Sequence, residues 1–304
     1  MITYEPTPAD RAPMPRHYAA ESRYLGYQDP DAAKPYVKYF RSVTLPVQEH
    51  IHEALLSGMA PGEYAYDLRD AACRMSRPGY HAMETGWTRV GGGYMICCLT
   101  DMPGVTAEMW DWWFGWHSTD SARYKLWYPD AHQFAAIGVD RSTDRTLTDR
   151  QRYVGNVSYV DEYIGGELNR LAIRFTDPTR LGFDDPAPGH TVICARVGLS
   201  QYPIAMGWLI HQIRPTSHGC EMRSRFFLGH ARFLDLPAHS SPGRGAALLT
   251  TKPVRGLGGA ALPHLAGRAM GPGFGHGLLF HCAAEMNHLA SFLPALHEEF
   301  KGTP

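Results

Sequence analysis

The sequence of 304 residues has no excess of charge and no long apolar run. Twenty-nine lysine and arginine residues stand against thirty aspartate and glutamate residues, which leaves a formal net charge of -1. Neither sign forms a long run, so the chain lacks the electrostatic footprint of a protein that binds nucleic acid or an anionic membrane. No stretch approaches the roughly eighteen apolar residues of a membrane helix. These absences exclude nucleic acid and membrane as partners and favour a small molecule.

The cysteines are few, and none of them belongs to a CxxC pair. Six in a chain of this length are too sparse for a disulfide scaffold, so we expect buried free thiols. The first residues, MITYEPTPADRAPMPRHY, hold four prolines and several charges where a secretory signal needs an apolar core. This pattern predicts a cytoplasmic protein.

Aromatic and histidine residues are abundant. The chain contains seven Trp, sixteen Tyr, twelve Phe and sixteen His, and its 44% hydrophobic content can bury a large core. Aromatic side chains fill the core of any protein. Together with so many histidines, they also suggest an aromatic pocket beside titratable or metal-binding groups.

Residues 1–80 differ in pattern from the rest of the chain. A proline-rich arm of about thirty residues is followed by helix-forming sequence between Pro35 and Met59. A second helical stretch, AYDLRDAACRMSR, ends at Pro78 and Gly79. We therefore predict an amino-terminal arm with a small helical domain over residues 1–80, and a second domain over residues 81–304.

Short β-branched or aromatic segments dominate after residue 80. The segments GGGYMICCLT, HQFAAIGV, GNVSYVDEYIGG, LNRLAIRFTD, TVICARVGL, IAMGWLIHQIR and CEMRSRFFLGHARF are separated by turn residues and predict a mostly antiparallel sheet, hence an α+β fold. EMWDWWFGWHSTDSARYK indicates a helical interval, and the Gly/Pro-rich residues 240–276 could form a mobile cover over a site. Apolar spacing predicts a long final helix, with a kink at Pro294.

The final helix carries the first chemical signal. His281 and Glu285 lie four residues apart, which places them about 40° apart on one helical face. Leu278 and Leu289 belong to the same face, so the carboxylate of Glu285 is predicted to be buried. Burial of a carboxylate costs several kcal/mol unless it is paired, protonated or bound to a cation. A metal ion would remove that cost.

Two predicted strands repeat this pattern. Alternation places Glu162 between Val160 and Ile164 on one side, and it places His211 on the apolar side of its own strand. His132 opens another strand. His132, Glu162, His281 and Glu285 together offer two imidazoles and two carboxylates, which are suitable zinc ligands at about 2.0–2.2 Å.

Simpler interpretations of the same residues stay open at this point. His281 and Glu285 could form a helical ion pair, because polar pairs at this spacing are common. His132 and His211 could be core histidines bonded to the backbone. Glu162 would be a turn carboxylate if the strand register slipped by one residue, and the run WWFGWH is more typical of a core or an interface than of a catalytic site.

Several long runs, in order, resemble a known family. MPGVTAEMWDWWFGWH, RYKLWYPDAH, VDEYIGG, HQIRPTSHGCEMRSRFFLGH and HCAAEMNHL are similar to the 2,4-diacetylphloroglucinol hydrolase family, which includes phloretin hydrolase, over about Gly86 to Leu289. The resemblance implies a Bet v 1-like (START-like helix-grip) domain, a homodimer, and Zn2+ held by His132, Glu162, His281 and Glu285. It also implies hydrolysis of the carbon-carbon bond between a phenolic ring and an acyl group.

The resemblance assigns further roles. Tyr124, His211 and Glu162 are implied as catalytic residues: Tyr124 also hydrogen-bonds the phenolic substrate, and His211 transfers a proton. Two substrate-binding positions depart from the family, because Ala135 stands where we expect asparagine and Phe226 where we expect a second tyrosine. These departures leave the acylated phenol unspecified. A non-catalytic binder of phenols and a metal-dependent polyketide cyclase or hydratase are the alternative functions.

Overall fold

An antiparallel sheet forms the centre of the computed structural model, which describes residues 5–304. The sheet has eight strands in the order β1-β2-β8-β7-β6-β5-β4-β3. Their bounds are β1 Gly86–Val90, β2 Gly93–Pro103, β3 His132–Ile137, β4 Val157–Ile164, β5 Glu167–Thr176, β6 Thr191–Leu199, β7 Ile204–Thr216 and β8 Gly219–Phe233. This arrangement confirms the α+β class and the antiparallel sheet.

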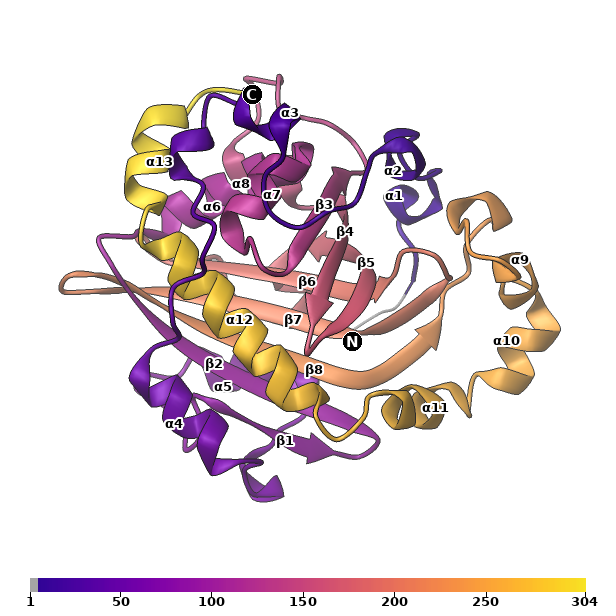
Figure 1. Cartoon of the computed structure of the whole chain (residues 1–304). Coiled ribbons are helices and arrows are strands. Elements are labelled where there is room, and N and C mark those ends of the chain that lie inside the picture. The colour runs from indigo at the N-terminus through magenta and orange to yellow at the C-terminus, as the bar shows by residue number, and fades with distance from the viewer. Residues whose placement is uncertain (1–4) are drawn as a thin grey trace.

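The helices lie around this sheet (Figure 1). They are α1 Pro8–Arg11, α2 His17–Ala20, α3 Asp29–Ala32, α4 Glu49–Ser57, α5 Ala71–Met75, α6 Ala107–Trp116, α7 Ser121–Trp127, α8 Asp149–Tyr153, α9 Ala246–Leu249, α10 Lys252–Gly258, α11 Leu262–Ala269, α12 Phe274–Ala290 and α13 Leu293–Phe300. None of the helices in residues 5–304 has the length and apolar character that a bilayer crossing requires.

The inner face of the sheet packs against α12, which crosses the strands and contacts β1, β2 and β4 (Figure 1). Inward side chains such as Ile96, Val160 and Leu209 share one core cluster with α12 and with the tryptophans of α6. Because successive strand residues alternate between faces, each strand contributes every second residue to this core. The inner face therefore contributes mainly apolar side chains to the core that it forms with α12 and α6.

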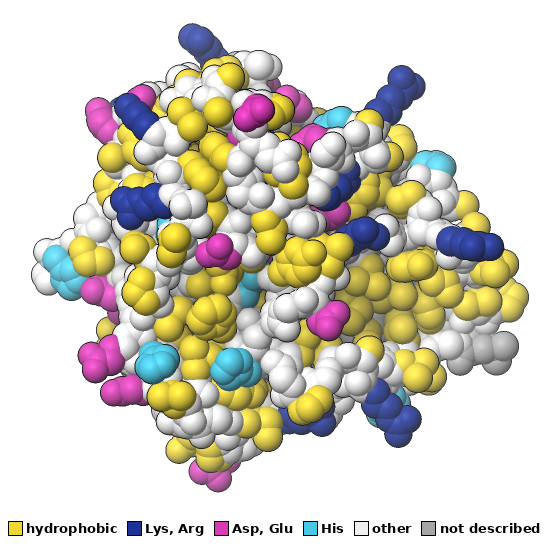
Figure 2. All heavy atoms as spheres, in the orientation of Figure 1, with side chains coloured by type: hydrophobic (Ala, Val, Ile, Leu, Met, Phe, Trp, Pro, Cys, Tyr) yellow, Lys and Arg dark blue, Asp and Glu magenta, His cyan; other side chains and the backbone are white. Residues whose placement is uncertain are grey.

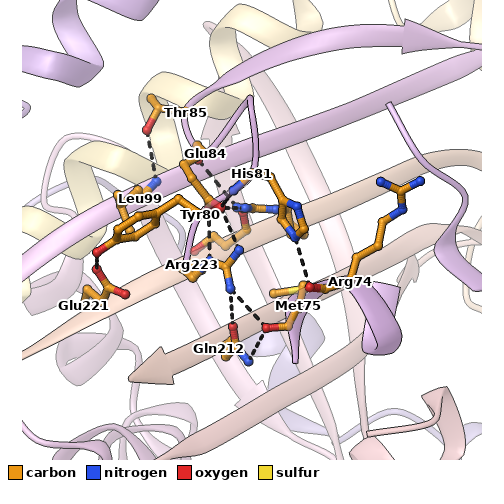
Figure 3. A network of polar contacts seen from close by, with 12 residues as sticks. Arg74, Met75, Tyr80, His81, Glu84, Thr85, Leu99, Gln212, Glu221 and Arg223 are labelled. Atoms are coloured by element: carbon orange, nitrogen blue, oxygen red, sulfur yellow. Dashed lines mark hydrogen bonds and ion pairs between the residues drawn. The ribbon is translucent and has the colours of Figure 1, made fainter. Parts of the chain in front are cut away.

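Residues 60–85 cover part of the outer face of the sheet. Tyr66, Leu68 and Met75 pack there against Trp208 and Phe227. Buried polar groups fasten the segment to β8: the carboxylate of Glu84 accepts hydrogen bonds from Arg223 and Arg225, and Arg223 also donates to the carbonyl of Met75 (Figure 3). The amino-terminal part also reaches the inner core, through Tyr36, Ile51 and Leu55. The domain division near residue 80 stays a prediction.

Two helical segments differ from expectation, and one strand was not predicted. The predicted helix between Pro35 and Met59 is short: only α4 is α-helical, preceded by a single 3-10 turn at Val37–Tyr39. Pro46 explains the late start, because a proline disfavours helical backbone in the residue before it. The 240–276 segment has structure of its own in α9, α10 and α11. Strand β1 was not predicted, because its five residues carry too short a pattern.

The sequence predicts one long final helix with a kink at Pro294. The structure instead has two separate helices in this region. α12 ends at Ala290, and Pro294 lies in the first turn of a separate helix, α13. Proline is well suited to a first helical turn, where its missing N–H needs no partner. Five of the six cysteines are buried, and all are free as expected; the exposed one is Cys73.

Candidate metal centre and cavity

Two neighbouring strands and one helix bring the four predicted ligands together. His132 begins β3 and pairs in register with Glu162 on β4. His281 and Glu285 occupy successive turns of α12, above these strands. Gly277 and Gly165 allow the close approach, since a Cβ on Gly277 would lie 2.8 Å from the Cα of Gly165. The helix therefore carries its two polar side chains down to the strand pair.

The donor atoms of these side chains face one another. Nε2 of His132 lies 3.8 Å from Glu162 Oε2 and 3.5 Å from Glu285 Oε2. Nε2 of His281 lies 3.9 Å from Glu162 Oε1 and 3.8 Å from Glu285 Oε2. All four residues are less than a tenth exposed. Two imidazoles and two carboxylates thus surround one small buried volume.

Backbone contacts fix the orientation of both imidazoles. Nδ1 of His132 bonds to the carbonyl of Tyr124 at 3.0 Å, and Nδ1 of His281 bonds to the carbonyl of Tyr163 at 2.8 Å. A carbonyl only accepts, so each Nδ1 carries the hydrogen and each Nε2 presents a lone pair. Nε2 of His132 is buried and has no hydrogen-bond partner. Such an atom is expected of a metal ligand.

The donor set fits a metal ion. His132, Glu162 and His281 each offer one atom, and these atoms lie within 4.8 Å of one another. Four ligands arranged tetrahedrally at about 2.1 Å from zinc lie about 3.4 Å apart, close to the observed separations. The described residues therefore contain a group that could hold a metal ion, with Glu285 placed as a fourth donor.

Burial shifts the pKa of each of these groups toward its neutral form. It raises the pKa of Glu162 to about 7, with a smaller opposing effect from the hydrogen bond of Tyr124. It raises the pKa of Glu285 further, and the Glu162 charge adds to that shift. Burial lowers the pKa of His281 to about 4 and that of His132 well below its usual range. Neutral imidazoles are the form that binds metals.

The centre lies in the wall of a large cavity. The cavity has a volume of about 750 Å³, and Glu162, His281 and Glu285 contribute to its lining. Most other lining residues are apolar and come from β5 to β8, α12 and the α11 region. Figure 2 shows a recess with hydrophobic side chains between the sheet and the segment of α9 to α11. Ala266 and Met270 line it, so the 240–276 segment covers part of the cavity.

The other predicted site residues are distributed unevenly. Tyr124, His211 and Phe226 line the cavity, whereas Ala135 does not. The hydroxyl of Tyr124 donates to Glu162. Nδ1 of His211 contacts Ser224 Oγ at 2.8 Å, and burial lowers the pKa of His211 to about 3. Ala135 is buried in the core instead, a position that gives no support to its predicted role in substrate binding.

The structure adds polar cavity residues that the sequence analysis did not single out. His117 and Ser158 line the cavity, and Ser118 lies between them. The run WWFGWH is thus both core and cavity wall. A signal for Ser158 was present, because alternation places it on the same face of the strand as Val160 and Glu162.

This fold and site define a class of protein: an α+β protein with a large apolar cavity and a buried imidazole-carboxylate centre able to hold a metal. Comparison with known proteins narrows the class. The family model described as the DAPG hydrolase PhiG domain matches residues 68–298. The chain belongs to this family, and the prediction of a hydrolase is confirmed.

Individual relatives agree with this membership. The chain is 30% identical over 279 residues to 2,4-diacetylphloroglucinol hydrolase of Pseudomonas protegens, an alignment that covers 89% of this chain and 86% of the relative. It is 29% identical over 287 residues to phloretin hydrolase of Eubacterium ramulus, which covers 92% and 95% of the two chains. The span matched by the family model, residues 68–298, includes the positions of all four residues of the candidate metal centre.

Proposed function

We propose that this protein is a zinc-dependent hydrolase that cleaves the carbon-carbon bond between a phloroglucinol-type ring and an acyl group. The products are a deacylated phenol and a carboxylic acid. The observation that carries the proposal is the convergence of two imidazoles and two carboxylates in the wall of an apolar cavity. The names of the two relatives, hydrolases of an acylated phloroglucinol and of phloretin, support the substrate class.

Zinc suits the donor set of His132, Glu162, His281 and Glu285, since two carboxylates balance its charge. When bound, it would supply Lewis acidity, which polarises a carbonyl or lowers the pKa of a water molecule. The surrounding chain excludes bulk water, because all four ligands are buried. Low polarity around the centre strengthens every electrostatic interaction there.

The residues of the chain have separate tasks in this reaction. Hydrolysis breaks the bond between the ring and the acyl carbon, adds a hydroxyl group from water to that carbon, and adds a proton to the ring carbon. His211 is neutral and its Nδ1 contacts Ser224 Oγ, so we assign its other ring nitrogen, Nε2, the transfer of a proton from water to the ring carbon. The oxygen of Tyr124, whose own proton is donated to Glu162, accepts a hydrogen bond from a ring hydroxyl.

Two structural proposals accompany this function. We infer that the sheet and α12 form a Bet v 1-like helix-grip fold, since a long helix crosses an antiparallel sheet around a cavity (Figure 1). We also expect a homodimer that binds a small acylated phenol, and light scattering on the purified protein would measure its mass.

Replacement of a ligand tests the proposed function. We expect His281→Ala to remove bound zinc and to lower turnover of acylated phloroglucinols at least about a thousandfold, several kcal/mol of lost stabilisation. His276→Ala, on the same helix but exposed, is the matched control and keeps zinc and activity. Elemental analysis measures the metal, and mass spectrometry identifies the acid and the phenol.

Each outcome separates the proposed function from its alternatives. Full turnover by a metal-free His281→Ala variant would reject the metal centre. A wild-type protein that binds acylphenols without converting them would be a binder, and a product of unchanged or water-shifted mass without bond cleavage would indicate a cyclase or a hydratase.

A further inference from the structure

A chain of hydrogen bonds ends at the cavity wall at Ser158, four residues before Glu162 on β4. Nδ1 of His117 bonds to the carbonyl of Trp113 at 2.7 Å, and Nε2 of His117 contacts Ser118 Oγ at 3.1 Å. Ser118 Oγ contacts Ser158 Oγ at 2.7 Å. His117, Ser118 and Ser158 are all at most 2% exposed. His117 and Ser158 line the cavity.

The donor and acceptor roles along this chain are determined by its first link. A carbonyl oxygen cannot donate, so Nδ1 of His117 carries the hydrogen. Burial keeps the imidazole neutral, with its pKa lowered to about 4, so Nε2 has only a lone pair. Ser118 must therefore donate its single hydrogen to Nε2. The hydrogen between the two serines then belongs to Ser158.

Ser158 consequently has no hydrogen left for a ligand and offers only lone pairs to the cavity. We propose that Ser158 is a specificity residue, whose oxygen accepts a hydrogen bond from a hydroxyl group on the aromatic ring of the bound ligand. A ligand with an acceptor at this place would face unsatisfied lone pairs, and a ligand without a polar group would leave Ser158 Oγ unpaired at the cavity wall.

The position of Ser158 matches one ring of the proposed substrate. Four strand residues separate the Cα atoms of Ser158 and Glu162 by about 13 Å. Both side chains project from the same face of β4 into the cavity, and their separation along the strand leaves room for an aromatic ring substituted at opposite ends. With its carbonyl at the metal centre, an acylphenol then presents the opposite hydroxyl to Ser158. This orientation rests on the proposed function.

The same contact accounts for one departure from the family. Phe226 lines the cavity and cannot form the polar contact that a tyrosine would form with a phenol, whereas Ala135 lies outside the cavity lining. Ser158 provides a different acceptor, at the end of β4 where the ring hydroxyl opposite the acyl group is expected. The protein thus recognises a ring hydroxyl through the buried Ser158, whose hydrogen-bonding role is set by His117 through Ser118.

Binding of two ketones tests the inference. The probes are monoacetylphloroglucinol and the same ketone without the hydroxyl opposite the acetyl group, each mixed rapidly with the zinc-loaded protein, and quenching of Trp127 in the cavity wall reports binding. We expect the wild type to prefer the first ketone about tenfold, the value of one hydrogen bond, and Ser158→Ala to lose this preference. Ser158→Thr, which keeps the oxygen, retains it.

A second variant tests whether Ser158 donates its hydrogen to Ser118. Ser118→Ala frees the hydrogen of Ser158 for the cavity, so binding of an analogue with a methoxy group opposite the acetyl group should improve. Ser200→Ala is the matched control, because Ser200 is equally buried and lies outside the cavity lining. Equal losses for both ketones in Ser158→Ala, with Ser158→Thr behaving the same, would overturn the inference.

The two proposals fail in different ways. If no acylphenol is cleaved but the preference depends on Ser158, the proposed function is wrong and the hydroxyl site stands. If acylphenols are cleaved and the preference is the same in the wild type and Ser158→Ala, only the role of Ser158 is wrong.

Discussion

The two faces of the sheet both bury carboxylates, with different partners. On the outer face, Glu84 forms ion pairs with Arg223 and Arg225, whose side chains are fully buried. Arg223 Nη2 lies 2.6 Å from Glu84 Oε1 (Figure 3). On the inner face, the recorded contacts of Glu162 and Glu285 within the described residues are with imidazoles and a tyrosine. Among the described residues, arginine side chains contact Glu84 on the outer face, whereas the contacts given for Glu162 and Glu285 include no lysine or arginine.

The pKa values express this difference. Burial alone would raise the pKa of Glu84, but the hydrogen bond from Arg223 and the charge of Arg225 lower it to about 2. Burial raises the pKa of Glu162 to about 7, because the single hydrogen bond from Tyr124 offsets only part of the effect. The negative charge of Glu84 is balanced by arginines of the protein itself. The negative charge of Glu162 would be balanced by a bound cation, as in a metal centre.

The largest predicted effect is a loss of stability when the carboxylate on the outer face is removed. Glu84→Gln leaves two buried guanidinium groups without their carboxylate, and we predict a loss of about 3–5 kcal/mol in the free energy of unfolding. Urea unfolding of the metal-loaded protein measures it. Asp101→Asn removes an exposed ion pair with His218 and should cost at most about 1 kcal/mol. Equal effects of the two variants would show that the buried network does not stabilise the fold.

A smaller effect, this time a gain in stability, is predicted when the carboxylate of Glu162 on the inner face is removed. The folded, metal-free protein keeps the proton of Glu162 up to about pH 7, whereas a carboxyl of ordinary pKa releases it near pH 4.5. Ionisation of Glu162 therefore destabilises the metal-free fold as the pH rises through this window. Glu162→Gln removes the cost, so we predict that it stabilises the metal-free protein by up to about 3 kcal/mol above pH 7 and has little effect below pH 4.5.

Thermal or urea unfolding of chelator-treated wild type and variant, over a pH series, measures this difference. Taking the difference between the two proteins cancels the contributions of His132 and His281, which titrate in both. A Glu162→Gln variant that is less stable than the wild type at every pH would show that the site is complete without a cation. Zinc should reverse the order, since only the wild type retains both carboxylate ligands.

The sequence predicted the features that depend on local periodicity. Alternation placed Val160, Glu162 and His211 on the inner face, and all three line the cavity. The spacing of His281 and Glu285 on one helix was equally reliable, because four residues advance a helix by little more than one turn. Such patterns depend only on the geometry of the helix or strand itself, so they do not depend on how the rest of the protein folds.

Features that depend on contacts between distant segments were not predictable in the same way. Nothing in the run WWFGWH indicates that its histidine is linked, through Ser118, to Ser158 of β4, forty-one residues later. The network of Glu84 with Arg223 and Arg225 joins residues 139 and 141 positions apart, and was missed entirely. Ala135 was assigned from the resemblance alone, and the bulge between His132 and Phe134 shows how the inward and outward positions of β3 can shift.

The smallest effect tests the packing that joins the two elements of the inner site. A Cβ on Gly277 would lie 2.8 Å from the Cα and 3.2 Å from the nitrogen of Gly165, and backbone atoms cannot rotate away. Gly277→Ala should therefore displace α12 from the turn after β4 and move His281 relative to Glu162. We predict a tenfold to hundredfold loss of zinc affinity, typical of changes that disturb ligand orientation.

Competition with a chromophoric chelator measures the affinity of the Gly277→Ala variant. Gly256→Ala on α10 is the control, because a Cβ there meets no atom within 4 Å. Alanine favours helix over glycine by about 1 kcal/mol, so the stability of both variants could rise while only Gly277→Ala loses zinc. Unchanged zinc affinity in a folded Gly277→Ala protein would mean that the contact between α12 and β4 does not set the distance between the inner carboxylates and imidazoles.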